Sequence, residues 1–196
     1  YAHDLSQLPV DALVAGAHKF HGPKGVGFLY VRKDKKIHPF IHGGAQERNM
    51  RGGTENVIGI IGLAKALEIS LEELAAHRSH IEKIKGYFVE KLKQDIPGVA
   101  FNGCSADLDK SLYTVLNVSL PPSESNRGML LFHLDLEGIS ASGGSACSSG
   151  ATVGSHVLRA LHHPAERDAV RFSFSRFTTQ EEVDYTLEKL KALYTN

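Results

Sequence analysis

Short apolar runs separated by polar, glycine-rich stretches mark the first quarter of the chain. Residues 11–17 are mostly apolar and end in small residues, which is the pattern of a buried strand. Residues 18–25 contain glycines and a proline and predict a turn, and a second strand is predicted at 26–31. The polar, glycine-rich residues 42–54 predict a long loop.

The middle of the chain carries apolar residues at helical spacing from Ile58 to Leu92. Thr54 is the predicted N-cap of this segment, with Glu55 in the first turn. Because single helices of this length are rare in globular proteins, we expect a break near Ser70 or His77.

The second half alternates short strands and helices. Thr178 and Glu181 have the spacing of a capping box before a terminal helix. The order predicts an α/β chain with a piece of sheet at 1–54, then a linking helix and a small α+β domain at 55–196. The predicted shorter elements are strands at 99–102, 113–120 and 170–175, and helices at 124–136 and 155–161.

Composition narrows the class of protein. The 196 residues include 22 basic and 22 acidic side chains, so the net charge is zero and neither nucleic acid nor a membrane surface is expected as the main partner. No apolar run approaches the roughly 18 residues of a membrane span. Two cysteines make a disulfide framework improbable, and a reducing, cytoplasmic location is expected.

The pair His18-Lys19 lies where the first predicted strand ends. A lysine desolvated at such a strand end loses its proton more readily, and its neutral amine can form a Schiff base with an aldehyde cofactor. An ordinary surface lysine is the commoner alternative.

Arg48, Arg51 and Thr54 form a second candidate site, for an anion. Gly52 and Gly53 would let the backbone approach the anion, and the arginines and the threonine would supply further donors. A solvated glycine hinge explains the same pattern equally well.

Cys147 lies in the Ser/Gly-rich segment 142–150, where few apolar neighbours are available to bury a thiol. Thiolate formation and access are therefore possible, and an incidental exposed thiol is the alternative. Cys104 fits an ordinary strand-end residue.

Arg171 alternates with phenylalanines on a predicted strand and shares a polar face with Ser173 and Ser175. A carboxylate would suit it, and a solvated edge-strand arginine is the alternative. The eleven histidines suggest a metal, but their spacing provides no ligand cluster with cysteine or carboxylate, so no metal site is predicted.

Together these segments resemble class V, fold-type I pyridoxal-phosphate enzymes, and within them the cysteine desulfurases of the NifS/IscS kind. The resemblance covers nearly the whole chain. Its residues are AHKFHGPKGVG at 17–27, HGG at 42–44, ER at 47–48, MRGGT at 50–54, NVS at 117–119, SGGSAC at 142–147, VLRAL at 157–161 and RFSFSRFT at 171–178.

The resemblance implies a role for each candidate. Lys19 would carry pyridoxal phosphate covalently as a Schiff base, with His18 on the cofactor phosphate and Arg51 in the same cofactor-binding segment. Thr54 would reach the phosphate of the partner subunit's cofactor, which implies a homodimer. Arg171 would hold the carboxylate of the substrate, L-cysteine.

Cys147 would take the substrate sulfur as a persulfide and leave L-alanine. The sulfur would pass to an acceptor or iron–sulfur scaffold protein, and Cys147 could transiently ligate an iron–sulfur cluster. Gly16 replaces the family's usual phosphate-binding serine, so one hydroxyl contact is lost. The other cofactor contacts of the family precede Tyr1, so the chain is expected to be a C-terminal half, inactive by itself.

Two alternatives accompany this interpretation. One is a selenocysteine lyase or related β-elimination enzyme, which turnover of selenocysteine against cysteine would separate from a desulfurase. The other is a non-catalytic dimerisation and docking module, which would give no pyridoxal absorbance when the cofactor is added.

Overall fold

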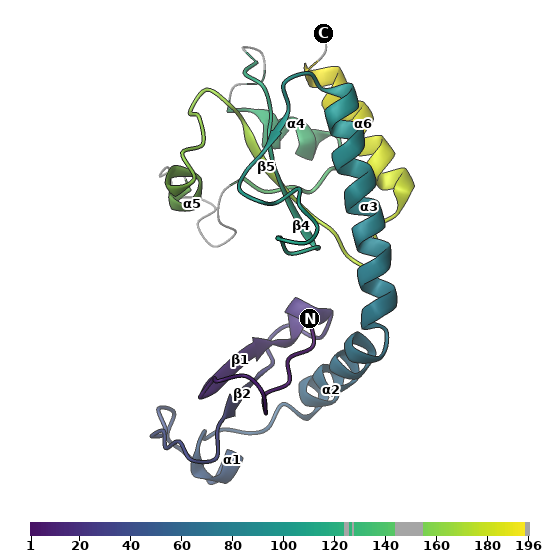
Figure 1. Cartoon of the computed structure of the whole chain (residues 1–196). Helices are drawn as coiled ribbons and strands as arrows, with labels where there is room; N and C mark the ends of the chain where they lie inside the picture. The colour runs from purple at the N-terminus through teal and green to yellow at the C-terminus, as the bar shows by residue number, and fades with distance from the viewer. Residues whose placement is uncertain (124–125, 127, 144–154, 195–196) are drawn as a thin grey trace. The chain divides into compact units, whose positions relative to one another are not determined.

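The computed structural model describes residues 1–123, 126, 128–143 and 155–194. The chain divides into an N-terminal unit, Tyr1–Ala75, and a C-terminal unit, Ala76–Asn196 (Figure 1). The sequence prediction placed the domain boundary after residue 54. The two compact units divide at Ala75, just beyond the first long helix, and this helix contacts the short 3-10 helix that follows the first strand.

The N-terminal unit contains a two-stranded antiparallel sheet. Strand β1 (Ala12–Gly16) pairs with β2 (Gly27–Val31), and the 3-10 helix η1 (Ala17–Phe20) follows β1 directly. Both strands lie where the sequence predicts them. The expectation of a buried first strand is wrong within the described chain, since the Val14 side chain is 78% exposed.

The long helical segment is broken in two, as the sequence predicts. Helix α2 (Val57–Glu72) ends at Glu73, and α3 (Leu74–Asp95) follows. The predicted cap at Thr54 is wrong, because Asn56 Oδ1 accepts the Gly59 N–H at 3.0 Å and so takes the N-cap position. The Ser70 hydroxyl lies 3.4 Å from the Phe20 carbonyl oxygen and links α2 to η1.

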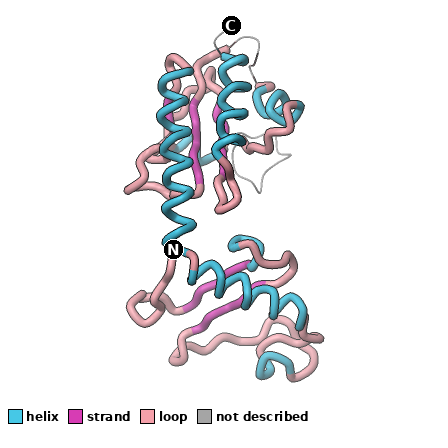
Figure 2. Tube along the Cα trace, turned by 90° about the vertical axis from the view of Figure 1, so that its right-hand side faces the viewer, coloured by secondary structure: helices cyan, strands magenta, loops and turns pink. Residues whose placement is uncertain are grey.

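A three-stranded antiparallel sheet forms the centre of the C-terminal unit (Figure 2). Its order is β3 (Ala100–Phe101), β4 (Val115–Ser119) and β5 (Ala169–Ser173). On the free side of β5, Ser142 exchanges two backbone hydrogen bonds with Arg171, at 2.7 and 3.2 Å. Arg171 is therefore paired with Asn117 of β4 on one side and with Ser142 on the other.

One face of this sheet carries the core. The T-shaped contact between Phe88 and Phe172, with ring centroids 5.1 Å apart, joins α3 to β5. Helix α4 (Leu130–Leu136) and helix α6 (Gln180–Tyr194) add further apolar side chains. The buried cluster includes Ile81, Ile84, Phe88, Val89, Leu92, Leu116, Val118, Leu130, Leu134, Val170, Phe172, Val183, Leu187 and Leu190.

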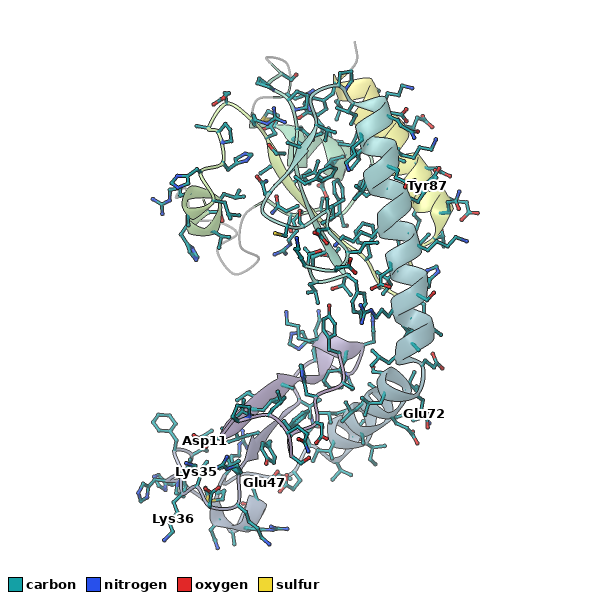
Figure 3. All side chains as sticks on the ribbon, in the orientation of Figure 1. Asp11, Lys35, Lys36, Glu47, Glu72 and Tyr87 are labelled. Carbon is teal, nitrogen blue, oxygen red and sulfur yellow. The ribbon has the colours of Figure 1, made fainter. Side chains whose placement is uncertain are left out.

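Polar contacts also join α3 to α6. The Tyr87 hydroxyl donates to Asp184 Oδ1 at 2.5 Å (Tyr87 is labelled in Figure 3). His80 Nε2 lies 2.8 Å from the Thr178 carbonyl oxygen just before α6. These contacts hold the two helices side by side over the core.

Side-chain caps begin the helices α5 (His156–Ala160) and α6. Helix α5 begins after Ser155, whose hydroxyl accepts the Leu158 N–H, within the segment predicted as a helix. The capping box of α6 is one residue later than predicted. Thr179 Oγ1 accepts from Glu182 N at 3.2 Å and Glu182 Oε2 accepts from Thr179 N at 2.9 Å, because Thr178 Oγ1 already accepts from Ser175 N.

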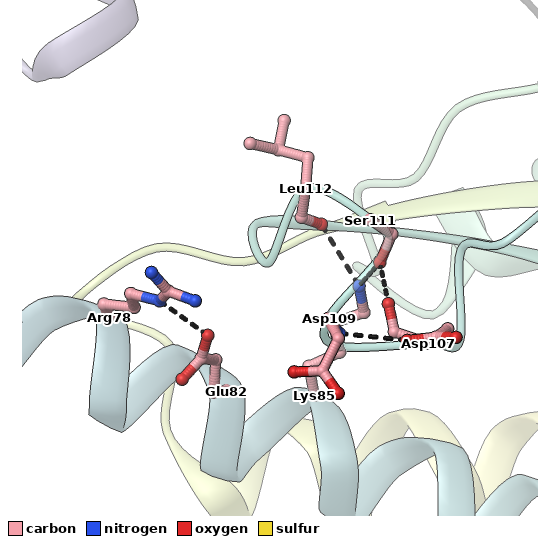
Figure 4. A network of polar contacts seen from close by, with 7 residues as sticks. All are labelled: Arg78, Glu82, Lys85, Asp107, Asp109, Ser111 and Leu112. Atoms are coloured by element: carbon pink, nitrogen blue, oxygen red, sulfur yellow. Dashed lines mark hydrogen bonds and ion pairs between the residues drawn. The ribbon is translucent and has the colours of Figure 1, made fainter. Parts of the chain in front are cut away.

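A fully buried lysine joins α3 to the loop between β3 and β4. Lys85 Nζ donates to Ser111 Oγ at 2.8 Å and to the Leu112 carbonyl oxygen at 3.1 Å (Figure 4). Burial lowers the pKa of Lys85 below its ordinary value, while Asp107 and Glu82 act in the opposite direction.

The architecture confirms the predicted α/β class, with small antiparallel sheets. Within the described ranges, no helix is both long and apolar enough to cross a membrane.

We expect Glu182→Ala to lower the free energy of unfolding by about 0.5–1.5 kcal/mol more than Glu181→Ala does. Both substitutions remove a negative charge from the first turn of α6, but only Glu182 bonds back to Thr179. Urea unfolding followed by circular dichroism measures the difference. Equal losses in the two variants would contradict the shifted capping box.

Lys85 makes the stability of the chain depend on pH. Its pKa is lower in the folded than in the unfolded chain, so the unfolded chain binds more protons between the lowered value and about 10.4. The free energy of unfolding should therefore rise with pH in that window. Lys85→Met should remove part of the rise, whereas Lys83→Met at an exposed position should keep it. Identical pH slopes in the two variants would refute this effect.

Candidate functional site

The first group of candidate residues lies at the end of β1. Gly16 ends the strand, and His18 and Lys19 lie in η1, where both side chains are exposed. The expected desolvation of Lys19 is therefore not present in the described chain, where this side chain is exposed. Both side chains are accessible to a ligand.

The His18 side chain lies close to the backbone of Gly16. A Cβ on Gly16 would lie 3.1 Å from His18 Cε1 and 3.3 Å from Nδ1. The imidazole thus lies over the position at which a side chain of residue 16 would begin. The Nδ1 atom of His18 thus lies beside position 16, where the sequence resemblance described above predicts a serine hydroxyl.

The second group lies in the loop 42–54, whose backbone has an unusual conformation. The short element α1 (Gln46–Asn49) contains three consecutive residues with left-handed backbone, since φ is 47° at Glu47, 57° at Arg48 and 67° at Asn49. Such a conformation costs roughly 1–2 kcal/mol per residue for side chains with a Cβ. Strain of this kind persists where the surrounding structure requires a particular loop shape.

Hydrogen bonds close this loop on itself. Gln46 Oε1 accepts the Gly53 N–H at 3.1 Å, and Gly52 N donates to the Ile41 carbonyl oxygen at 3.0 Å. Gly52 is buried against Gly43, and a Cβ at position 52 would lie 2.7 Å from Gly43 N. The close approach of the two backbones therefore requires glycine at position 52.

The two predicted anion donors of this loop, Thr54 and Arg51, differ in their contacts. Thr54 is exposed, whereas Arg51 Nη1 donates to the Gly52 carbonyl oxygen at 3.0 Å. Among the residues that the structure describes, no hydrogen bond or ion pair links Arg51 or Thr54 to His18 or Lys19. Both groups lie in the N-terminal unit.

The predicted substrate residue, Arg171, lies on β5 in the C-terminal unit. Its backbone is fixed by the two bonds to Ser142. Its side-chain Nε is buried and has no hydrogen-bond partner within the described residues. A buried guanidinium N–H without a partner is costly, so this atom is suited to an acceptor from a ligand.

A polar network on the same sheet was not predicted from the sequence. Asn102 Nδ2 donates to Asn117 Oδ1 at 2.8 Å, and Asn102 Oδ1 lies 2.9 Å from His163 Nδ1. The other ring nitrogen of His163 lies 3.0 Å from the Arg167 carbonyl oxygen. The available signal was a polar Asn117 between the apolar Leu116 and Val118, but its partners lie far away in the sequence.

Arg167 and Asp168 attach the segment after α5 to the rest of the unit. Arg167 donates from Nε to Ser119 Oγ and from Nη2 to the Gly98 carbonyl oxygen, both at 2.7 Å. The Tyr194 hydroxyl donates to Asp168 Oδ2 at 3.0 Å, and burial together with the Asp168 charge raises the pKa of Tyr194. These bonds hold the start of β5 against β4 and α6.

Cys147 lies outside the described residues, so its predicted role stays a prediction. Cys104 is a free thiol and is exposed. Across the described ranges, no three histidine, cysteine or acidic side chains gather in a way that could hold a metal ion.

Comparison with known proteins reveals related chains. The sequence model described as Aminotransferase class-V matches residues 1–186. A protein of Dictyoglomus turgidum named cysteine desulfurase IscS is 43% identical over 192 residues, 97% of this chain and 48% of the relative. One of the same name from Methanosarcina thermophila is 42% identical over 187 residues, 94% of this chain and 45% of the relative.

Solved structures similar to this chain include two NifS-like proteins. A NifS-like protein has a TM-score of 0.79 at 38% identity, over 97% of this chain and 48% of its own. A NifS-like protein from Rickettsia africae has a TM-score of 0.82 at 25% identity, over 98% of this chain and 50% of its own. The chain therefore spans about half the length of the proteins it matches.

We expect Gly52→Ala to open the loop 42–54, because its Cβ would overlap the Gly43 backbone. Overpacking of this kind costs about 1–3 kcal/mol, so trypsin should cut after Arg48 or Arg51 about tenfold faster than in the unsubstituted chain. Gly43→Ala is the matched control, since its Cβ would lie at an ordinary 3.5 Å from Gly52 Cα. Equal cleavage rates in the two variants would contradict the close approach.

Proposed function

Because this chain belongs to the aminotransferase class-V family, we propose that the protein containing it is a pyridoxal-phosphate-dependent cysteine desulfurase. The observation that carries the proposal is the similarity, over 97% of the chain at 43% identity, to a protein named cysteine desulfurase. The names of the relatives favour this reading over a selenocysteine lyase or a docking module. The chain supplies a lysine, a thiol and a carboxylate-binding arginine for that reaction.

The N-terminal unit has a donor set that fits a phosphorylated aldehyde. Lys19 offers an exposed primary amine for covalent attachment, and His18, over Gly16, offers a ring nitrogen to the phosphate. Thr54 and Arg51 lie in the closed loop 42–54, where Thr54 offers a hydroxyl to the phosphate of the partner subunit in a homodimer. When bound, pyridoxal phosphate supplies an electron sink that stabilises negative charge at the substrate Cα.

Lys19 would have a second task when cofactor and substrate are both bound. Its free amine takes a proton from the substrate Cα and delivers a proton to the carbon that loses sulfur. Arg171 holds the substrate carboxylate, and its buried Nε gains the acceptor that it lacks in the described chain.

Cys147 performs the sulfur transfer. Its thiolate sulfur forms a bond with the substrate sulfur while the substrate Cβ–S bond breaks. L-cysteine and the Cys147 thiol thus become L-alanine and a Cys147 persulfide, with no net oxidation or reduction. The persulfide sulfur then passes to an acceptor protein, such as an iron–sulfur scaffold, in the reducing cytoplasm.

In the intact protein, Cys147→Ala should abolish sulfide release from L-cysteine in the presence of a thiol reductant. Cys104→Ala provides the matched control and should keep the activity, because Cys104 is an exposed thiol outside the proposed chemistry. Sulfide and L-alanine are measured in parallel. Unchanged sulfide release in the Cys147 variant would overturn the role of this thiol.

A further inference from the structure

Three polar side chains, those of Asn102, Asn117 and Arg171, lie side by side across the C-terminal sheet. Asn117 on β4 is the register partner of Arg171 on β5, and the amides of Asn102 and Asn117 approach to 2.8 Å. Residues directly opposite each other in antiparallel strands have side chains on the same face, with Cβ atoms about 4.5–5.5 Å apart. Because the sequence neighbours Leu116 and Phe172 are buried in the core, the polar side chains lie on the other face.

Backbone bonding brings Asn117 and Arg171 especially close. The Asn117 carbonyl oxygen accepts from Asn102 N at 3.0 Å, and the backbone N–H and C=O of Arg171 both bond to Ser142. Neither residue thus uses these groups toward the other, which defines a non-hydrogen-bonded pair. In such pairs the Cα atoms are about 4.5 Å apart and the side chains are at their closest.

His163 fixes one end of a chain of polar contacts that leads to this pair. Its Nε2 lies 3.0 Å from the Arg167 carbonyl oxygen, and because a carbonyl can only accept, Nε2 carries a proton. Its Nδ1 lies 2.9 Å from the nearer end of the Asn102 amide. In the neutral ring Nδ1 holds a lone pair and accepts, so the end of Asn102 that faces it is the NH₂.

The neutral ring thereby orients both amides. The two ends of a carboxamide have the same shape, so the hydrogen bonds decide which end carries the oxygen. With its NH₂ on His163, Asn102 turns its oxygen to Asn117 and accepts from the Asn117 NH₂. The reverse order, in which Asn102 donates to Asn117, belongs to the cationic ring, which donates from both nitrogens. In the neutral state the oxygen of Asn117 is therefore the group that remains.

This oxygen belongs to a side chain that adjoins one with donors only. The Arg171 guanidinium has five N–H groups and no acceptor, and its buried Nε has no partner within the described residues. A carboxylate bound in the bidentate manner uses two of the five, so three N–H groups remain. An acceptor for one of these three fixes the plane of the guanidinium before a substrate arrives.

We propose that Asn117 is a positioning residue for Arg171, whose guanidinium donates to the Asn117 side-chain oxygen and is thereby held in the orientation that binds the substrate carboxylate. This inference rests on the proposed function, in which Arg171 holds the carboxylate of L-cysteine. Asn102 and His163 act through Asn117, because they set which end of its amide faces Arg171. A guanidinium fixed in this way loses less side-chain freedom when it binds a planar carboxylate.

The first test measures binding to the intact protein by calorimetry, using L-alanine and ethylamine. The two ligands differ only in the carboxylate. Asn117→Ala should raise the dissociation constant of L-alanine about tenfold, as expected for the loss of a hydrogen bond to a charged group, and should leave that of ethylamine unchanged. Ser173→Ala, at an exposed position on β5, is the control and should change neither affinity. Equal losses for the two ligands would contradict the proposal.

A second background separates an effect through Arg171 from direct contact with the ligand. The ammonium of Arg171→Lys has no plane to orient, so adding Asn117→Ala to this variant should change L-alanine binding less than about twofold. A further tenfold loss there would show that Asn117 acts independently of the guanidinium, and the proposal would be wrong.

A pair of variants at Asn102 tests which end of the Asn117 amide faces Arg171. An aspartate side chain offers only acceptors, so in Asn102→Asp the Asn117 NH₂ turns to it and the Asn117 oxygen stays on Arg171. Because His163 can donate to the new carboxylate, Asn102→Asp should keep the L-alanine affinity within about threefold, whereas Asn102→Leu, of similar size, should weaken it more. Equal losses in the two variants would overturn the assigned orientation.

The outcome for the proposed function is distinguishable from these results. If the unsubstituted protein bound no L-alanine and released no sulfide from L-cysteine, the proposed function itself would fail, and this role with it. If the unsubstituted protein does both and Asn117→Ala binds L-alanine normally, only the positioning role fails.

Discussion

The antiparallel pairing of β4 with β5 is the constraint on which the C-terminal unit depends. Leu116 pairs with Phe172 and Val118 with Val170, and all four side chains are buried in the core. Because side chains alternate along a strand, this register sends Asn117 and Arg171 together to the other face. A shift of one residue would bury the arginine and expose the core, so one register serves both stability and the proposed substrate contact.

The N-terminal unit has a different organisation, in which loop shape matters more than burial. Three left-handed residues, the Gln46 contact to Gly53 and the Gly43–Gly52 approach confine the loop 42–54 to one conformation. The same short segment also carries Arg51 and Thr54. Concentration of strain beside candidate anion donors is typical of binding loops.

Much of the fold could be predicted from the sequence, because hydrophobic periodicity and turn residues are local signals. They locate both strands of the first sheet, the broken long helix and the α/β class. The N-caps of α2 and α6 were harder to predict, since several adjacent residues have side chains that can cap a helix. Asn56 competes with Thr54, and Thr179 becomes the cap of α6 because Thr178 Oγ1 bonds to Ser175. Such choices depend on backbone geometry that a local pattern does not contain.

The sequence by itself determined the family, since the matched residues 1–186 include the contiguous lysine, glycine-loop, cysteine and arginine strings, and it is also the source of the proposed site residues. Only the tertiary structure decided which residues lie beside them. Asn102, Asn117 and His163 meet through strand pairing and a long-range hydrogen bond, and Asn117 adjoins Arg171 through the β4–β5 register. Register follows from burial of the whole core rather than from any short segment, which is why this meeting of polar residues is not visible in the sequence.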